Sequence, residues 1–561
     1  MNFTDVYGTA VLVVIPIIVT DIQNSILIIP SKNCKVTQQK HRLLRQYGYN
    51  LQIMWECDWD REVKSNEDLK QFLASYEMVE PLNPRHAFFG GRTNAVRLHH
   101  VANETQGEQI KYVDVTSLYP WVNKTQQYPI GHPIIITNPG NQDIHAYFGV
   151  AKVDVISPYH LYHPVLPFRH RGKLTLPLCR TCMEEEMTKD LLEKSHRCPH
   201  SPEERLLRGT WCTPELVKAV EVGYRIVHIH EVWHSPEEQR QEGLFADYVN
   251  TWLKIKQESA GYPGWAQTEE QKQQYVRDYF DKEGITLDPL LIEKNPGRKA
   301  TAKLMLNSFW GKFGENLHKK TTEAVTTPVH LFALVSNTVT DIHTVRICSQ
   351  DSLEVVYLNL RENQPDNGRV NIFIAAFTTC WARLKLYSYL EQLQQQVLYF
   401  DTDSVIFSLK PGQPNIPLGD FLGEMTNELD DGDYIIDFTS AGPKNYGYKT
   451  KNGKVCCKVR GFTLNVRGQQ QLNYNIMRQN LLDELTDPLD ERRNIDVVNP
   501  NFFTRHPATK QLKVGPRTKR YGLVFDKRVV DPDTFKSYPY GYIPSGFNDV
   551  DMENAETLLE L

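Results

Sequence analysis

A short hairpin pattern constrains the fold of this chain more than any other stretch. Two apolar runs, Val397–Phe400 and Val405–Phe407, flank Asp401-Thr-Asp403. Flanks this apolar predict two buried strands, whose connecting turn presents two carboxylates at the edge of a sheet. Carboxylates this close raise each other's pKa unless a cation neutralises them, and such hard oxygen ligands suit Mg²⁺ or Mn²⁺. A solvated acidic turn is the alternative for Asp-x-Asp alone.

Length and charge set broad limits on the class of protein. The 561 residues suffice for three or four domains, and the net charge of −5 excludes a chain that is basic throughout. A nucleic-acid enzyme needs only a basic channel, so that class stays open. Ten cysteines, irregularly spaced apart from one cluster, indicate a reducing compartment. We expect an intracellular protein, nuclear if its host is a eukaryote.

The apolar stretch Ala10–Thr20 is interrupted by Pro16, and Asp5 stands where a signal peptide needs a basic start. The stretch is too short to span a bilayer, so it predicts two buried strands and no membrane association.

A third acid is expected near the hairpin. The alternating stretch Gln109–Val113 predicts a strand, which ends at Asp114 and runs into a turn closed by Pro120. A turn or N-cap Asp is the alternative here. Three acids on neighbouring strands are what a two-metal phosphoryl-transfer site requires, and they favour that chemistry.

Two helices and a third, basic one lie between these motifs. Leu244–Ser259 and Glu269–Asp281 have amphipathic patterns, and a helix starting at Pro296 carries four side chains of interest on one face. These are Lys299, Lys303, Asn307 and Trp310, at i, i+4, i+8 and i+11. Two cations, an amide and an aromatic ring could bind a triphosphate and a base; a solvated basic face is the alternative. Further on, Val329–Leu360 has the pattern of strands around a loop, and Ile372–Gln395 predicts a long helix.

Three other stretches suit contacts with phosphates. Gly90 and Gly91 would let backbone approach a phosphate, with Arg92 supplying charge. The turn around Lys444 follows a predicted strand at Tyr434–Phe438. From Arg505 to Arg528, eight lysines and arginines stand against one acid, the footprint of a phosphate-binding surface or of a merely solvated basic face.

The cysteine cluster predicts a zinc site. Cys179 and Cys182 form a CxxC pair, and Cys198 and His200 follow at an unusual spacing. Three thiolates and an imidazole can complete a zinc tetrahedron, whereas unbound packing cysteines are the alternative.

The N-terminal region is harder to interpret. Thr37–Tyr47 has a helical pattern, and Tyr49–Trp55 alternates like a strand that ends in the acidic run Glu56-Cys-Asp-Trp-Asp60. A packing domain with a charged strand end is favoured over a nuclease remnant. Ser65–Tyr76 predicts a surface helix with Ser65 as its N-cap.

Four motifs in their order along the chain resemble the motif set of family B DNA polymerases. They are Asp114-Val-Thr-Ser-Leu-Tyr-Pro120, Lys303-Leu-Met-Leu-Asn-Ser-Phe-Trp-Gly-Lys312, Tyr399-Phe-Asp-Thr-Asp-Ser404 and Pro443-Lys-Asn-Tyr446. The first three are similar to motifs A, B and C and the fourth to the KxY motif, while Phe88–Arg92 resembles the (Y/F)xGG element. Long segments between motifs A and B and between B and C are similar to the protein-primed branch, which inserts its two terminal-protein regions there. The cysteine cluster, the run Trp55–Asp60 and the closing stretch Lys519–Tyr542 are similar to polymerases of Polinton/Maverick transposons. The resemblance covers about residues 85–545.

The resemblance implies a DNA-directed DNA polymerase that uses two Mg²⁺ or Mn²⁺ ions, a DNA primer-template, dNTPs and a terminal protein as primer. It implies that Asp114, Asp403 and the carbonyl of Val115 bind the ions while Asp401 assists, and that Tyr119 excludes a ribose 2′-hydroxyl. Implied nucleotide-binding residues are Val115, Ser117, Leu118, Tyr119, Arg298, Lys299, Lys303, Asn307 and Trp310. Implied DNA-binding residues are Gly90, Gly91, Arg92, Thr402, Lys444, Tyr446, Arg517, Lys519 and Arg520.

Two features depart from the family pattern. Trp310 stands where motif B carries Tyr, so stacking is kept and a hydroxyl is lost. The family's exonuclease precedes these motifs, and residues 1–85 are too short to hold it. We therefore expect the polymerase part of a longer protein, with the exonuclease domain missing, which extends a matched primer but does not excise a 3′ mismatch.

The predicted fold class is α+β, a right hand with an antiparallel palm, helical fingers and a basic thumb. The predicted divisions are 1–85 of uncertain fold, 86–130 first palm part, 131–242 insertion resembling terminal-protein region 1, 243–316 fingers, 317–370 insertion resembling terminal-protein region 2, 371–470 second palm part, 471–545 thumb and 546–561 acidic tail. A reverse transcriptase is disfavoured because its hairpin usually reads YxDD. A truncated or domesticated DNA-binding remnant without activity is the other alternative, disfavoured by the intact acids and Lys303.

Overall fold

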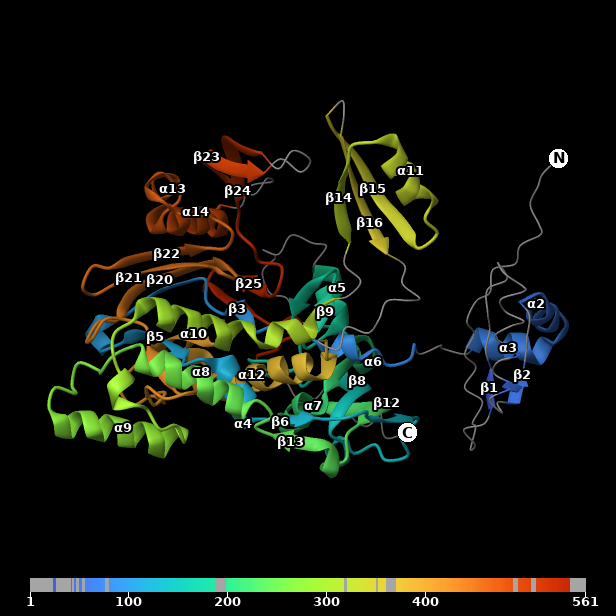
Figure 1. Ribbon diagram of the computed structural model, residues 1–561, viewed down its shortest axis with the longest axis horizontal. Coiled ribbons are helices and arrows are strands. Elements are labelled where there is room, and N and C mark those ends of the chain that lie inside the picture. Colours follow the sequence, from blue (N-terminus) through green and yellow to red (C-terminus); the bar gives the residue numbers. More distant parts are fainter. Residues whose placement is uncertain are drawn as a thin grey trace. The chain divides into compact units, whose positions relative to one another are not determined.

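The chain forms two compact units, residues 1–80 and 81–561, so the boundary lies five residues before the predicted one. The computed structural model describes residues 24–26, 42, 45–46, 50–52, 56–75, 80–186, 198–316, 320–349, 352–359, 370–487, 493–505 and 511–544 (Figure 1). Leu82 and Arg85 belong to the second unit, since Leu82 N donates to Glu231 and Arg85 donates to the carbonyl of Gly314. None of the helices in the described ranges has the length and apolar character needed to cross a bilayer.

The first unit corrects the prediction for the acidic run. The strand pair is β1 (Asn24–Ile26), parallel to β2 (Asn50–Gln52), and Glu56–Asp60 begins helix α2 (Glu56–Ser65) instead of ending a strand. Lys64 lies in its last turn, where a cation complements the helix dipole. Helix α3 (Glu67–Ser75) is capped by Asn66, not by Ser65, since Asn66 Oδ1 accepts from Leu69 N. Ala10–Thr20 and most of Thr37–Tyr47 lie outside the described residues.

The second unit is built on a nine-stranded sheet in which every recorded pairing is antiparallel. The strand order is β22-β21-β20-β5-β18-β17-β3, with β19 beside β5 and β4 beside β20. Its strands are β3 (Thr93–Ala95), β4 (His99–Val101), β5 (Gln109–Val115), β17 (Val397–Asp401), β18 (Ser404–Leu409), β19 (Met425–Asn427), β20 (Ile435–Gly442), β21 (Asn445–Thr450) and β22 (Val455–Val459). The predicted acidic hairpin is therefore confirmed as β17–β18, which lies between β5 and β3 in the sheet.

The two faces of this sheet bury different cores because side chains alternate along each strand. Val113 and Val405 point to a core shared with α12 (Ile372–Leu393) and α4 (Leu118–Thr125). Tyr112 and Ile406 point to a second core shared with the C-terminal part. This two-sided burial explains why both hairpin strands are apolar throughout.

Three helices form the region predicted as fingers. They are α8 (Ala246–Glu258), α9 (Glu269–Glu283) and α10 (Pro296–Ser308), close to their predicted ranges. Ala302 and Leu306 are the buried residues of α10, which packs on α8. Trp310 lies beyond α10, in the 3₁₀ helix η7 (Trp310–Gly314), so it does not extend the helical stripe as predicted.

The first insertion contains an antiparallel sheet of order β11-β8-β12-β7. Its elements are β7 (Ile134–Thr137), β8 (Gly149–Ile156), β9 (Phe168–His170), β10 (Lys173–Thr175), α5 (Arg180–Glu186), α6 (Pro202–Arg205), β11 (Leu207–Cys212), α7 (Thr213–Glu221) and β12 (Arg225–His234). β6 (Gln127–Pro129) pairs with β13 (Arg240–Glu242) where the insertion leaves and rejoins the rest of the unit.

The second insertion differs from its prediction. It consists of β14 (Thr321–Val325), β15 (Thr340–Ser349) and β16 (Ser352–Asn359), with helix α11 (Pro328–Ser336) where strands were expected. Thr327 caps α11 by accepting from His330 N, and Pro328 occupies its first turn. This start signal outweighs the strand-like composition that follows.

The C-terminal part contains α13 (Val466–Gln471), α14 (Tyr474–Thr486), the ribbon β23 (Ile495–Arg505) and β24 (Leu512–Tyr521), and the pair β25 (Val529–Asp531) and β26 (Lys536–Tyr538). The remaining 3₁₀ helices are η2 (Pro84–Ala87), η3 (Glu104–Gln106), η4 (Ile144–Ala146), η5 (Glu237–Gln239), η6 (Pro289–Leu291) and η8 (Gln394–Gln396).

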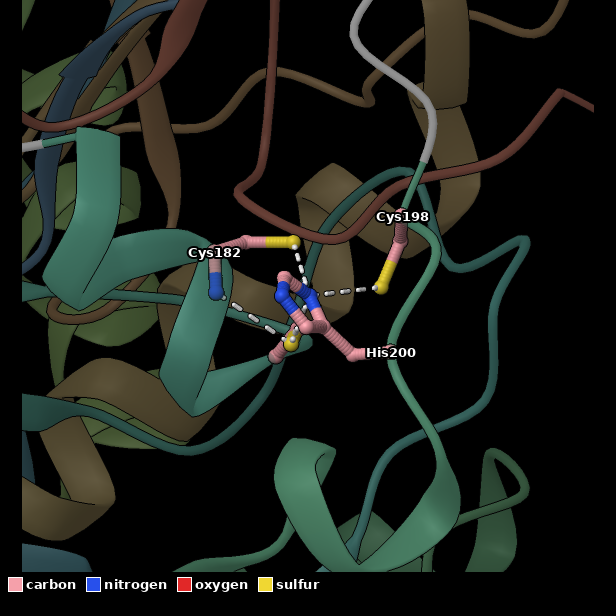
Figure 2. A group of neighbouring side chains, drawn as sticks. Cys182, Cys198 and His200 are labelled. Atoms are coloured by element: carbon pink, nitrogen blue, oxygen red, sulfur yellow. Dashed lines mark hydrogen bonds between the residues drawn. The ribbon is translucent and has the colours of Figure 1, made fainter. Parts of the chain in front are cut away.

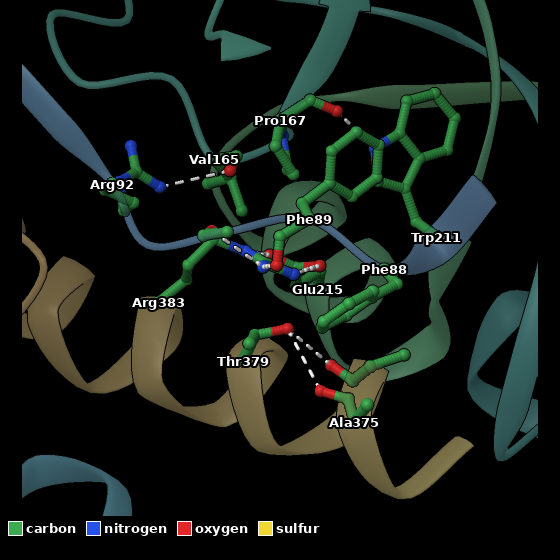
Figure 3. A network of polar contacts seen from close by, with 12 residues as sticks. Phe88, Phe89, Arg92, Val165, Pro167, Trp211, Glu215, Ala375, Thr379 and Arg383 are labelled. Carbon is green, nitrogen blue, oxygen red and sulfur yellow. Dashed lines mark hydrogen bonds and ion pairs between the residues drawn. The ribbon is translucent and has the colours of Figure 1, made fainter. Parts of the chain in front are cut away.

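A fully buried ion pair joins α12, α7 and the glycine turn (Figure 3). Arg383 donates to both carboxylate oxygens of Glu215 at 2.7 Å and to the carbonyls of Phe89 and Gly90. The side chains of Arg383 and Glu215 are 0% and 1% exposed. Burial alone would lower the pKa of Arg383, but the Glu215 carboxylate overrides it and raises that pKa.

We predict that Arg383→Met lowers the free energy of unfolding by about 3–5 kcal/mol, because it leaves the Glu215 carboxylate buried and unpaired. The double variant Arg383→Met/Glu215→Leu should lose clearly less, because no charge is stranded. Urea denaturation followed by tryptophan fluorescence measures both.

The exposed pair Lys451–Glu104 provides the control, and Lys451→Met should change stability by less than about 1 kcal/mol. Equal losses in the single and double variants would contradict the importance of the stranded charge.

Candidate active site

Asp114 and Asp403 lie side by side where β5 ends and the β17–β18 hairpin turns. Asp114 stands near the end of β5 opposite Ser404 of β18, and Val115 N donates to the Asp403 carbonyl at 2.7 Å. Both carboxylates line an open cavity of about 500 Å³. The structure thus brings together the predicted motif A and motif C acids.

The two acids oppose each other's ionisation. Burial, the Asp403 charge and the Glu428 charge raise the pKa of Asp114 to about 8. Burial and the Asp401 charge raise the pKa of Asp403 to about 6. A bound cation would stabilise the ionised carboxylates in place of the protons that Asp114 and Asp403 hold. Hard carboxylate oxygens next to the end of β5 fit a divalent ion such as Mg²⁺ or Mn²⁺.

Glu428 is an acid that the sequence did not single out. It follows β19, is exposed, and its backbone N donates to the carbonyl of Tyr112. Its charge acts on Asp114 and Asp403 only because β19 pairs with β5. No local motif marks it, so only the strand pairing reveals it.

Asp401 holds the hairpin turn together. Its Oδ1 accepts from Thr93 Oγ1 at 2.7 Å, from Thr402 Oγ1 at 3.1 Å and from Lys444 Nζ at 2.6 Å. Thr402 has a positive φ of 60°, and its N donates to the Arg92 carbonyl. Asp401 therefore fixes the turn and the position of Lys444.

Lysines gather beside the acids. The Lys303 charge acts on Asp114, and the charges of Lys299 and Lys303 act on Lys256 of α8. Burial and these two neighbours lower the pKa of Lys256, whose Nζ donates to Ser117 Oγ at 3.1 Å. This cationic group faces the start of α4, a favourable environment for an anion. Lys256 was missed in the sequence because it sits among ordinary helix-surface charges.

Aromatic packing connects motif A to the region after α10. Tyr119 and Trp310 stack with centroids 4.6 Å apart and an interplanar angle of 28°. Lys299, Lys303 and Asn307 are exposed on α10, as is Arg298. Leu118 is buried in the core, so only its backbone is available to a nucleotide.

Cations line the same cavity as the acids. Lys444, Lys458 and Arg460 all contribute to its lining. Lys458 lies over the rings of Tyr112 and Tyr446 and acts on the charge of Asp114. Tyr446 is 6% exposed, and its hydroxyl pairs with the Tyr112 hydroxyl at 2.9 Å. Tyr446 lies in β21 and lines the cavity, so it supports Lys458 from the strand.

The glycine turn is corrected in part. Arg92 is 1% exposed and donates to the carbonyls of Pro164 and Val165, so its charge is not presented to a phosphate. A Cβ on Gly91 would lie 2.8 Å from the Thr402 side chain, so this glycine is required for packing on the hairpin. Gly90 is exposed with open space around it.

The basic C-terminal stretch forms a two-stranded ribbon. Arg517 is exposed and lies over the Phe502 ring. Lys519 donates to the Gly461 carbonyl, and Arg520 pairs with Asp496 at 3.0 Å. Arg528 is buried, with its guanidinium on Ser537, so it adds no surface charge.

The four predicted zinc ligands also come together. Cys179, Cys182, Cys198 and His200 place their ligand atoms within 4.8 Å of one another.

The paired acids, the neighbouring lysines and the cations that line the cavity form one candidate active site on the central sheet. The family model for DNA polymerase type B, organellar and viral, matches residues 78–395, and the chain belongs to that family.

Known proteins similar to the chain include a "Probable DNA polymerase" of Neurospora intermedia, 22% identical over 401 residues. The match covers 69% of this chain and 33% of that protein, so the chain spans about a third of the length of the curated relative. Similar solved structures include Phi29 DNA polymerase with primer-template DNA, with a TM-score of 0.46, 14% identity and coverage of 87% of this chain and 71% of that one. Its ternary complex with incoming nucleotide gives a TM-score of 0.45, 13% identity and coverage of 83% and 67%.

We predict that the contribution of Asp114 to the stability of the protein in magnesium-free buffer falls as the pH rises from about 4 to about 8. The native state holds a proton on Asp114 in this range while the unfolded state has released it, so the free energy of unfolding decreases with pH. Asp114→Asn should remove most of this decrease. Urea midpoints at several pH values measure it.

Asp431→Asn, at an exposed acid, is the control and should leave the pH dependence unchanged. An unchanged dependence in Asp114→Asn would contradict the raised pKa. Added Mg²⁺ should stabilise the wild type more at pH 8 than at pH 5, because protons compete less for the site.

Proposed function

We propose that the chain is a DNA-directed DNA polymerase, which adds dNTPs to a primer 3′-hydroxyl under the direction of a DNA template. The observation that carries the proposal is the pairing of Asp114 with Asp403, two acids with raised pKa values beside a group of lysines. Membership of the type B family supports it.

Asp114, Asp403 and the carbonyl of Val115 would hold two Mg²⁺ ions, or Mn²⁺ in their place. The mutual repulsion of the carboxylates supports this fit. Two bound ions would supply activation of the attacking primer oxygen and neutralisation of the leaving pyrophosphate.

The chain's own residues position the nucleotide. Lys256, Lys299 and Lys303 bind the triphosphate and neutralise its charge, and the backbone at the start of α4 adds N–H donors. The Tyr119 ring stacks on Trp310 and packs against the sugar of the incoming nucleotide. Asn307 and Arg298 are exposed on α10, the helix that carries Lys299 and Lys303, and would contact the same nucleotide.

Primer phosphates bind to the cations that line the cavity, Lys444, Lys458 and Arg460. Lys444 is held by Asp401, so primer binding is linked to the hairpin that carries Asp403. Arg517 and Lys519 on the ribbon extend the cationic surface to duplex DNA.

The proposal includes protein-primed replication of a mobile or viral-like element, with a terminal protein as primer. Its support is that the two segments predicted as insertions form elements of their own, the first a four-stranded sheet and the second β14, α11, β15 and β16. A non-catalytic DNA-binding remnant is disfavoured because neighbouring acids still raise the pKa of Asp114, an arrangement typical of functional sites.

We expect Asp114→Ala and Asp403→Ala each to lower the rate of primer extension by far more than roughly tenfold, because each removes an ion ligand. Binding of primer-template should be nearly unchanged because cationic contacts to phosphates hold the duplex. Extension of a labelled hairpin primer with Mg²⁺ and dNTPs and fluorescence anisotropy measure the two properties.

Asp431→Ala is the matched control and should extend like the wild type. Extension by either acid variant within about tenfold of wild type would overturn the metal assignment. Equal extension on an RNA template would favour a reverse transcriptase.

Tyr119→Ala should raise incorporation of ribonucleotides relative to deoxynucleotides. The missing ring leaves space for a 2′-hydroxyl that the wild-type ring excludes. Single-nucleotide incorporation with matched dNTP and rNTP measures the ratio. Tyr119→Phe, which keeps the ring, should retain discrimination, and an unchanged ratio in Tyr119→Ala would leave Tyr119 as a packing residue.

A further inference from the structure

The cysteine cluster is assembled from two short segments of the first insertion (Figure 2). Cys179 precedes α5 and Cys182 lies in its first turn, while Cys198 and His200 precede α6. All three cysteines are buried.

The distances suit a tetrahedral ion. His200 Nδ1 lies 3.5, 3.2 and 3.7 Å from the sulfurs of Cys179, Cys182 and Cys198. A zinc with sulfur ligands at about 2.3 Å and a nitrogen ligand at about 2.0 Å places each sulfur about 3.5 Å from the nitrogen. The other ring nitrogen, Nε2, lies 3.6 Å from a carboxylate oxygen of Glu185, an acceptor of the kind that orients metal-bound histidines.

A buried arginine supplies the matching charge. Arg205 is 0% exposed and donates to Cys198 Sγ at 2.9 Å. Its other acceptors in the described part of the chain are the carbonyls of Ser157 and Gly541, so none is a carboxylate. Zn²⁺ with three thiolates and a neutral imidazole carries a net charge of −1, which is the counter-ion that this buried cation needs.

The segment 535–543, here called the C-terminal segment, lies against the cluster. Gly541 has φ +85°, and a Cβ there would lie 2.4 Å from Cys179 Cβ. Leu178 N donates to the Tyr540 carbonyl, and Arg205 donates to the Gly541 carbonyl. The other end of the segment is held by the central sheet, since Leu98 N donates to the Phe535 carbonyl and Ser537 N to the Val96 carbonyl.

We propose that Cys179, Cys182, Cys198 and His200 bind one structural Zn²⁺, and that this ion fastens the C-terminal segment between the first insertion and the central sheet. Four protein ligands close the coordination shell, so the ion has a structural role. The proposal does not depend on polymerase activity.

The first test uses the full chain purified without chelators. Elemental analysis should find one zinc per chain, and replacement by Co²⁺ should give the absorption bands of tetrahedral cobalt–thiolate. Cys182→Ser should lose the metal, whereas Cys212→Ser, at a buried cysteine outside the cluster, should keep it. Absence of zinc after expression and after reconstitution with zinc, or iron in its place, would overturn the proposal.

The second test concerns the C-terminal segment and needs no variant. A zinc-selective chelator, with Mg²⁺ kept in the buffer, should increase hydrogen exchange at the amides of residues 535–543, and added zinc should reverse the increase. Unchanged exchange in this segment after complete zinc removal would overturn its fastening by the ion.

A glycine pair provides a matched comparison. Gly541→Ala should release zinc to the chelator roughly tenfold faster, because its Cβ would displace Cys179. Gly172→Ala shares the left-handed backbone, with φ +75°, but has open space around it and should release zinc like the wild type. Equal release rates in the two variants would refute the contact between the segment and the site.

Discussion

The buried pair of Arg383 and Glu215 is the interaction on which the active-site geometry depends. Arg383 holds the carbonyls of Phe89 and Gly90, and two residues later the Arg92 carbonyl accepts from Thr402 N. The tip of the acidic hairpin is thus hydrogen-bonded to a turn that a charged side chain fixes in place. Because α12 carries Arg383 and also leads through η8 into β17, the same helix positions both partners of this contact. The pair costs desolvation free energy, and what it gives in return is a defined position for Asp403.

The site itself is arranged for ligands that bear charge. Asp114 and Asp403 repel each other when both are ionised. Burial and the charges of Lys303 and Lys299 lower the pKa of Lys256. Further opposite charge would stabilise the ionised form of each group. Metal ions satisfy the acids and a triphosphate satisfies the lysines, so substrate and ions together relieve both. Local electrostatic conflict of this kind marks functional sites more than structural ones.

The sequence predicted the elements whose signals are local. The hairpin, β5, α8, α9 and α12 follow from apolar periodicity, and the paired acids follow from motif resemblance. The errors arose where long-range contacts decide. Arg92 resembles a phosphate ligand until two carbonyls of the first insertion bury it. Glu428 and Lys256 become site residues only through strand pairing and helix packing. The alternating apolar pattern of Tyr49–Trp55 predicts a strand that ends in the acidic run, whereas helix α2 already begins at Glu56.

Three buried arginines of the second unit show how differently such a charge can be stabilised. Arg383 has the Glu215 carboxylate. Arg92 has carbonyls and the face of Tyr387, and burial lowers its pKa to about 10, so it stays protonated at neutral pH. Arg205 has carbonyls, the Tyr159 ring and a cysteine sulfur. A neutral thiol is a weak acceptor for a guanidinium, whereas a zinc-bound thiolate is a charged one. The environment of Arg205 therefore favours the metal-bound form of the cluster over four packed, protonated side chains.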